Sequence, residues 1–129
     1  MLTACLEHFN IVSDSVVNIS SPEYPNFYPD NLRCSWFVTS NKTNNVSVEI
    51  TFHQFLTFSG SDWLTIRRGN ETVLSDEIVR FNSFITPGTS IFVDEEEIWI
   101  EFRSSGIFRH VGLHLSISVT SERDGKKLI

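Results

Sequence analysis

The sequence predicts an all-β domain, built as a two-layer antiparallel β-sandwich. Apolar and polar residues alternate with a period of two along much of the chain, and no segment sustains a 3.6-residue repeat. The composition agrees, with 11 Phe and 3 Trp against 1 Met, because aromatic side chains pack well on a pleated surface. Short stretches rich in Pro, Gly, Asn and Ser separate the alternating segments, as is typical of sandwiches.

Six segments have the alternation expected of strands with one buried face. They are residues 34–38, 46–52, 63–67, 90–93, 98–102 and 113–119. Turn signals lie at 20–22, 24–26, 28–31, 40–45, 68–70 and 86–88. The acidic run 94–97 is interpreted as a hairpin turn with solvated charges, with a cation site as the alternative.

The 129 residues suit one domain with a genuine hydrophobic core. We expect residues 1–4 to be an N-terminal flank, 5–120 the domain, and 121–129 a polar tail or linker. The net charge of -6 argues against nonspecific binding to nucleic acid or anionic membranes. No apolar run approaches the roughly 18 residues needed for direct membrane insertion.

Acceptor motifs for N-linked glycans favour an extracellular location, either secreted or in the ectodomain of a membrane protein. Four Asn-x-Ser/Thr motifs occur, at Asn18, Asn41, Asn45 and Asn70. In that oxidising setting Cys5 and Cys34 are expected to form a disulfide. The alternative is a pair of unpaired buried thiols.

A series of motifs then resembles a known family. In order, the chain has Cys5, then Ser21-Pro22-Glu23-Tyr24-Pro25-Asn26-Phe27-Tyr28-Pro29, Cys34-Ser35-Trp36, Phe52-x-x-Phe55, Asp62-x-Leu64-x-Ile66, a late strand at 98–104 and a closing strand at 112–119. This order is similar to that of CUB domains over roughly residues 5–120. The resemblance implies a CUB-like jelly roll that recognises a protein partner within a secreted or membrane-anchored multidomain protein, such as a receptor or adhesion protein.

The chain departs from the family at two features. CUB domains commonly have a second disulfide, but Ser59 stands at its first position and no further cysteine exists. Many members bind calcium through a Glu, two Asp and a supporting Tyr. Tyr28 and Asp62 match these positions, whereas Phe58 and Ser105 replace the Glu and the late Asp.

Since calcium prefers several carboxylates, we predict neither a metal nor a cofactor. Glu23 or Glu101 would have to compensate, and nothing in the sequence requires either to reach the site. Asp62 is instead expected to accept hydrogen bonds from backbone groups of neighbouring loops.

Partner binding is predicted at the same end of the sandwich, where two loops have apolar tips at 55–60 and 105–110. The candidate partner-binding residues are Phe58, Ile107, Phe108, Arg109 and Tyr24, since aromatic and Arg side chains dominate binding hot spots. The alternative is that the phenylalanines fold inward over the core, which is favoured for Phe55.

No catalytic residues are predicted, because no motif frames a serine nucleophile with a base. His110 and His114 have a spacing that separates them on a strand, so solvent-facing histidines are favoured over a metal pair. Two other functions stay open. One is a carbohydrate-binding domain with Trp63 or Trp99 exposed for stacking, and the other is a self-associating module that forms a homo-oligomer.

Overall fold

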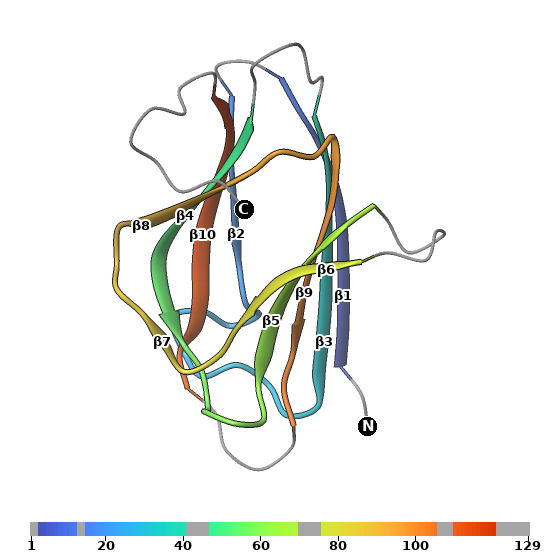
Figure 1. Ribbon diagram of the computed structural model, residues 1–129. Coiled ribbons are helices and arrows are strands. Elements are labelled where there is room, and N and C mark those ends of the chain that lie inside the picture. The colour runs from blue at the N-terminus through green and yellow to red at the C-terminus, as the bar shows by residue number, and fades with distance from the viewer. Residues whose placement is uncertain (1–2, 13–14, 41–46, 70–75, 106–109, 121–129) are drawn as a thin grey trace.

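The computed structural model describes residues 3–12, 15–40, 47–69, 76–105 and 110–120, and within them it contains ten strands and no helix. The strands form two sheets that face each other (Figure 1). Their bounds are β1 Thr3–Ile11, β2 Val16–Ser20, β3 Leu32–Ser40, β4 Ser47–Leu56, β5 Trp63–Arg68, β6 Glu77–Phe81, β7 Phe84–Ile85, β8 Thr89–Val93, β9 Glu97–Arg103 and β10 Gly112–Thr120.

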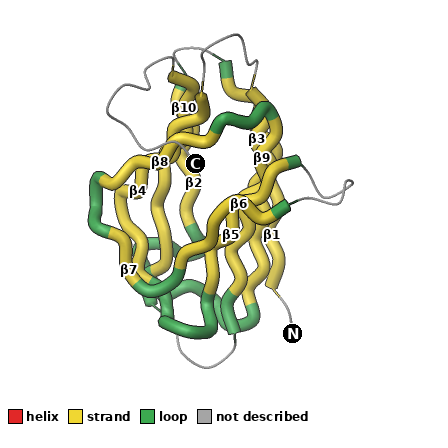
Figure 2. The backbone as a smooth tube through the Cα atoms, viewed as in Figure 1, coloured by secondary structure: helices red, strands yellow, loops and turns green. Residues whose placement is uncertain are grey.

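The first sheet has the strand order β1-β3-β9-β5-β6, and the second has the order β2-β10-β4-β7 with β8 also paired to β4. Figure 2 shows the two layers and the loops that join them at the ends. The expected β-sandwich is therefore confirmed, with one difference. β1 and β3 are parallel, because β2 lies between them in sequence but belongs to the opposite sheet.

The six expected strands are present, and the four strands without a prediction lie at sheet edges. β1 and β6 do not alternate cleanly: Leu6 is exposed on β1, and a register shift follows Ile66 where β5 pairs with β6. Strand pairing already begins at Thr3, inside the expected N-terminal flank. Edge strands bury only part of one face, which weakens the period-two signal.

The core fills the space between the sheets with alternating side chains from both. Its largest fully buried side chains include Trp36, Tyr28, Phe52, Phe55 and Phe102. The rings of Phe52 and Phe55 meet edge to face at 5.9 Å, a favourable arrangement for aromatic pairs. The inward orientation favoured for Phe55 is thus confirmed.

The disulfide between Cys5 and Cys34 is also confirmed. The two residues are directly paired across β1 and β3, with Cα atoms 4.5 Å apart and a sequence separation of 29. The bond therefore fastens the edge strand β1 to the sheet.

Candidate functional site

One end of the sandwich is closed by the segment 21–31, which connects β2 to β3 without forming a strand. This segment places Tyr28 in the core, where its ring meets Phe102 edge to face at 5.1 Å. The connection from β4 to β5 contributes Asp62, which is fully buried. The chain after β9 contributes Ser105, so three distant segments meet at this end.

These three residues form one hydrogen-bonded network, which we call the Asp62 network. The Tyr28 hydroxyl donates to Asp62 Oδ2 and accepts from the Phe58 N–H at 3.2 Å. Asp62 Oδ1 accepts from the Ser105 N–H at 2.9 Å and from the Ser61 hydroxyl at 3.0 Å. The role expected for Asp62, acceptor for backbone groups of a neighbouring loop, is confirmed.

Burial raises the pKa of the Tyr28 hydroxyl well above its ordinary value, and the hydrogen bond to Asp62 raises that pKa further. Both effects favour the protonated phenol, since only that form can donate to the carboxylate. At neutral pH Tyr28 is therefore a hydrogen-bond donor to Asp62.

Measurements at alkaline pH should show that the free energy of unfolding is coupled to the protonation of Tyr28. Because the pKa of Tyr28 is raised in the folded state, its contribution to stability is complete below the unfolded pKa of about 10 and is lost above it. Tyr28→Phe lowers the free energy of unfolding at neutral pH, but the gap to the wild type should narrow by about 1.4 kcal/mol between about pH 9 and pH 11. Urea denaturation of both proteins across this range measures the gap, and a constant gap would contradict the coupling.

The residues at this end do not fit the calcium ion that the CUB resemblance implies. Both oxygens of Asp62 already accept hydrogen bonds, and the described residues contain no group of three or more His, Cys, Asp or Glu side chains that could hold a metal. The sequence 106–109 is Gly-Ile-Phe-Arg, which adds no carboxylate. Calcium takes six to eight oxygens and favours several carboxylates, so a lone buried Asp is a poor site.

Glu101 does not compensate for the missing ligands. Its carboxylate lies on the outer face of the first sheet, where Arg33 Nε donates to it at 3.0 Å and Arg67 lies 3.7 Å away. The side chain is only 3% exposed, so these two guanidinium groups balance a buried charge.

Tyr24 is placed on the outer face of the second sheet. Its hydroxyl donates to Gln54 at 2.6 Å, and its ring lies 5.6 Å from that of His114. His114 also lies 4.9 Å from His53, so it is half-buried and packed between rings rather than simply facing solvent. His110, which was also expected to face solvent, contacts Phe27.

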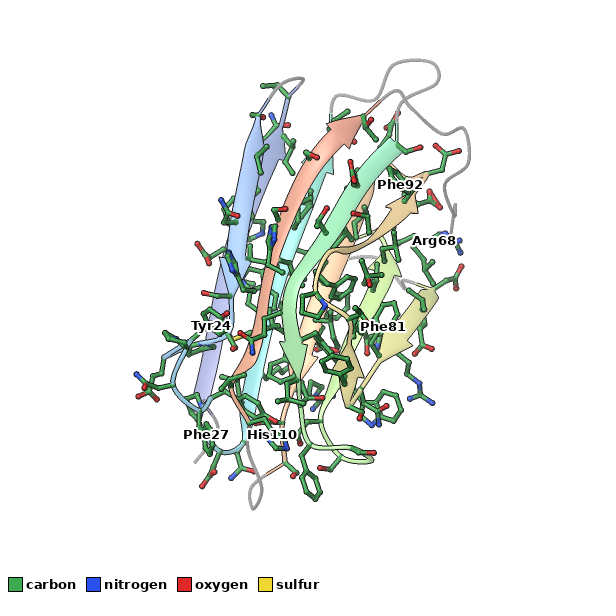
Figure 3. The ribbon with its side chains drawn as sticks, turned by 90° about the vertical axis from the view of Figure 1, so that its left-hand side faces the viewer. Tyr24, Phe27, Arg68, Phe81, Phe92 and His110 are labelled. Atoms are coloured by element: carbon green, nitrogen blue, oxygen red, sulfur yellow. A yellow bond between two sulfur atoms is a disulfide. The ribbon has the colours of Figure 1, made fainter. Side chains whose placement is uncertain are left out.

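Phe27 is an exposed aromatic residue that the sequence reasoning missed. Its side chain is 56% exposed and meets His110 edge to face at 6.4 Å. Figure 3 shows Phe27 and His110 together at the end of the sandwich, with Tyr24 further along. The aromatic and proline residues of 24–29 indicated that this segment presents aromatic side chains. The interpretation considered only its two tyrosines and not Phe27.

Of the predicted partner-binding residues, Phe58 is half-buried, and its backbone joins the Asp62 network. Phe84 on β7 is 59% exposed and pairs directly with Leu56 of β4, two residues before Phe58. Ile107, Phe108 and Arg109 lie outside the described residues.

The two tryptophans considered for sugar stacking have neighbours over their rings. Trp99 stacks on Phe37 at 5.6 Å, and the Arg67 guanidinium lies 5.3 Å from the ring centroid. The Arg80 guanidinium lies 4.5 Å from the centroid of Trp63. Both rings are half-buried, so part of each ring is covered by these neighbours and part stays accessible.

The described glycan acceptor is Asn18, which is exposed on the edge strand β2 and pairs with Ser116 of β10. A glycan attached there would lie over the outer face of the second sheet. Asn41, Asn45 and Asn70 lie outside the described residues. Within the described residues, no helix is long and apolar enough to cross a membrane.

Comparison with known proteins agrees with this geometry. Cubilin from Sus scrofa is 27% identical over 106 residues, which cover 77% of this chain but only 3% of cubilin. The full extracellular region of zebrafish Gpr126/Adgrg6 superposes with a TM-score of 0.69 at 23% identity, covering 88% of this chain and 15% of that one. The MASP-1 CUB2 domain bound to Ca²⁺ superposes with a TM-score of 0.66 at 25% identity, covering 84% and 96%.

The family profile that matches is that of the CUB domain, over residues 5–116. That range contains the disulfide and the Asp62 network, and it ends within the closing strand β10. The two-sheet fold and its superposition on these structures point the same way. This chain belongs to the CUB domain family.

Proposed function

We propose that this domain is an extracellular protein-recognition module that binds its partner through the loop end of the sandwich without calcium. The Asp62 network is the observation that carries the proposal. The MASP-1 CUB2 domain is calcium-bound, whereas here Asp62 is occupied by Tyr28, Ser61 and Ser105. The network holds the loops in place, and the exposed side chains of these loops bind the partner.

Aromatic side chains supply that surface. We call Phe27, Phe58 and Phe84 the aromatic end. Phe27 and Phe84 are both more than half exposed, and Phe58 is half-buried, with its backbone N–H bound to Tyr28. Large apolar side chains on a rigid end favour a protein partner, because rigid aromatic anchors lose little conformational entropy on binding. Ile107, Phe108 and Arg109 extend this proposal to the neighbouring loop.

We also propose that the domain performs no catalysis. The hydroxyl groups at this end are used as structural partners: Ser21 Oγ accepts from the Leu113 N–H at 3.1 Å, and Ser61 Oγ donates to Asp62. Neither is hydrogen-bonded to a histidine in the described contacts, so neither of these two hydroxyls is an activated nucleophile.

A binding screen tests the proposal. The chain is screened against purified secreted proteins and ectodomains from its own organism, and each protein that binds is measured again in EDTA. Phe27→Ser and Phe58→Ser should each weaken binding about tenfold or more, as expected for hot-spot residues. Val16→Ser is the matched control, because Val16 is 60% exposed on the second sheet, away from the aromatic end.

Three results would contradict the proposal. Loss of binding in EDTA would show dependence on a metal. Binding to glycans alone would favour the carbohydrate-binding alternative, and binding to the chain itself alone would favour self-association.

Glycan occupancy tests the extracellular location separately. Protein secreted from eukaryotic cells should have glycans on at least two of Asn18, Asn41, Asn45 and Asn70, with exposed Asn18 among them. Mass spectrometry of peptides before and after enzymatic deglycosylation measures the occupancy of each site. Unmodified asparagine at all four positions would contradict an extracellular origin.

A further inference from the structure

A row of four side chains crosses the outer face of the first sheet. Arg33 on β3 pairs directly with Arg103 on β9, and Arg103 pairs directly with Trp63 on β5. Arg80 on the edge strand β6 completes the row, with its guanidinium 4.5 Å from the Trp63 centroid. All three arginines are exposed and Trp63 is half-buried. We call these four residues the arginine row.

The described arginines are concentrated on this sheet, which also carries Glu7, Glu77, Glu97 and Glu101. The described residues contain five arginines and no lysine, and all five arginines lie on β3, β5, β6 or β9, although the chain has a net charge of -6. Like charges placed directly opposite each other on neighbouring strands destabilise a sheet. The adjacent positive charges of Arg33 and Arg103 therefore destabilise the sheet, and the fold alone does not require them.

The guanidinium of Arg103 has N–H donors that are not used within the described part of the domain. Arg33 is bound to Glu101 at 3.0 Å, and Arg80 lies 3.7 Å from Glu77. In contrast, the guanidinium of Arg103 makes no hydrogen bond or ion pair with any described residue. An exposed guanidinium offers five N–H groups in a fixed plane that suits a carboxylate.

Apolar surface adjoins the row. Trp63 lies within it, and Leu6, which is 54% exposed, lies on β1 opposite Ser35, one row away from Arg33. Arg and Trp are the residue types most enriched in binding hot spots. The face thus combines charge with apolar contact area, and a polypeptide can use both.

We propose that the arginine row binds an acidic segment of a partner polypeptide, with its carboxylates on Arg103 and Arg33 and an apolar side chain against Trp63. Strands lie about 4.8 Å apart, so the four-strand row spans roughly 14 Å, the length of about four extended residues. A dense sulfated chain suits the row less well, because Glu101 and Glu77 interrupt the positive charge. This surface is distinct from the aromatic end, so the two proposals fail independently.

A titration of the ¹⁵N-labelled chain with a short poly-L-glutamate peptide tests the proposal, with the three tryptophan indole N–H resonances as reporters. The Trp63 resonance should move most, while that of Trp36, which is buried in the core, should stay in place. Arg103→Gln should weaken binding about fivefold or more, and added salt should weaken it further. Arg68→Gln is the matched control, because Arg68 is an exposed arginine of the same sheet already paired with Glu95 and Asp76.

Several outcomes would overturn the proposal. A Trp63 resonance that the peptide leaves in place in the folded protein would overturn it. Equal loss of binding for Arg103→Gln and Arg68→Gln would indicate nonspecific attraction and would also overturn it. Tighter binding of a heparin oligosaccharide of matched charge would assign the row to a sulfated glycan instead. Both variants change only exposed side chains, so unchanged amide spectra confirm that each is folded.

Discussion

Replacing Asp62 with alanine is expected to lower the free energy of unfolding by about 3 kcal/mol, because the change leaves several buried polar groups without partners. Asp62 is 0% exposed and accepts from the Tyr28 hydroxyl, the Ser105 N–H and the Ser61 hydroxyl. Tyr28 is equally buried, so water cannot replace its lost acceptor without opening the end of the sandwich. Urea denaturation of the variant and the wild type measures the loss.

Asp62→Asn is the matched control. Its side-chain oxygen can still accept the Ser105 N–H, and its amide group fills the same volume, but it cannot accept the Tyr28 proton at the second position. We expect it to retain about half of the stability that alanine loses. A loss below about 1 kcal/mol for Asp62→Ala would show that the network does not hold this end together.

Removing the disulfide should have an effect of similar size. Double replacement Cys5→Ala and Cys34→Ala opens a loop of 29 residues, and the chain-entropy estimate for such a loop is about 3.6 kcal/mol. The parallel pairing of β1 with β3 makes this bond more important, because β1 is the edge strand of its sheet. The free energy of unfolding should fall by this amount under the same urea conditions.

Reduction of the wild type is the control for packing changes at the two cysteines. A reductant should lower the stability of the wild type by about as much as the double replacement, and it should leave the variant unaffected. If the double variant lost less than about 1 kcal/mol, the edge strand would be held by its hydrogen bonds and side chains alone.

The central strands could be predicted from the sequence because one face of each is buried against the opposite sheet. β4 and β10 alternate visibly for this reason, whereas β3 and β9 also bury residues of their other face in the middle of the strand. β1 and β6 could not be predicted, since Leu6 faces solvent and the bulge after Ile66 shifts the register of β6. The parallel pairing of β1 with β3 depends on which sheet receives β2, and alternation contains no information on that choice.

The candidate site was predictable where a motif marked it. The resemblance placed Tyr28 and Asp62 together, and the missing carboxylates at Phe58 and Ser105 led to the expectation of a hydrogen-bonding Asp62. The Ser105 N–H was not predictable as its partner, because a backbone donor leaves no trace in residue identity. Nor was the arginine row, since Arg33, Arg103 and Trp63 become neighbours only through strand order and register.

The central claim is that hydrogen bonds among Tyr28, Asp62 and Ser105 replace calcium at the loop end of this CUB domain. A melting curve measured with calcium up to about 10 mM, and again in EDTA, tests it most directly, since extracellular calcium modules bind at about 0.1 to 1 mM. We expect the same melting temperature in all samples. A rise of several degrees that saturates with calcium and is absent with magnesium would contradict the claim, because a bound ion stabilises the folded state by mass action.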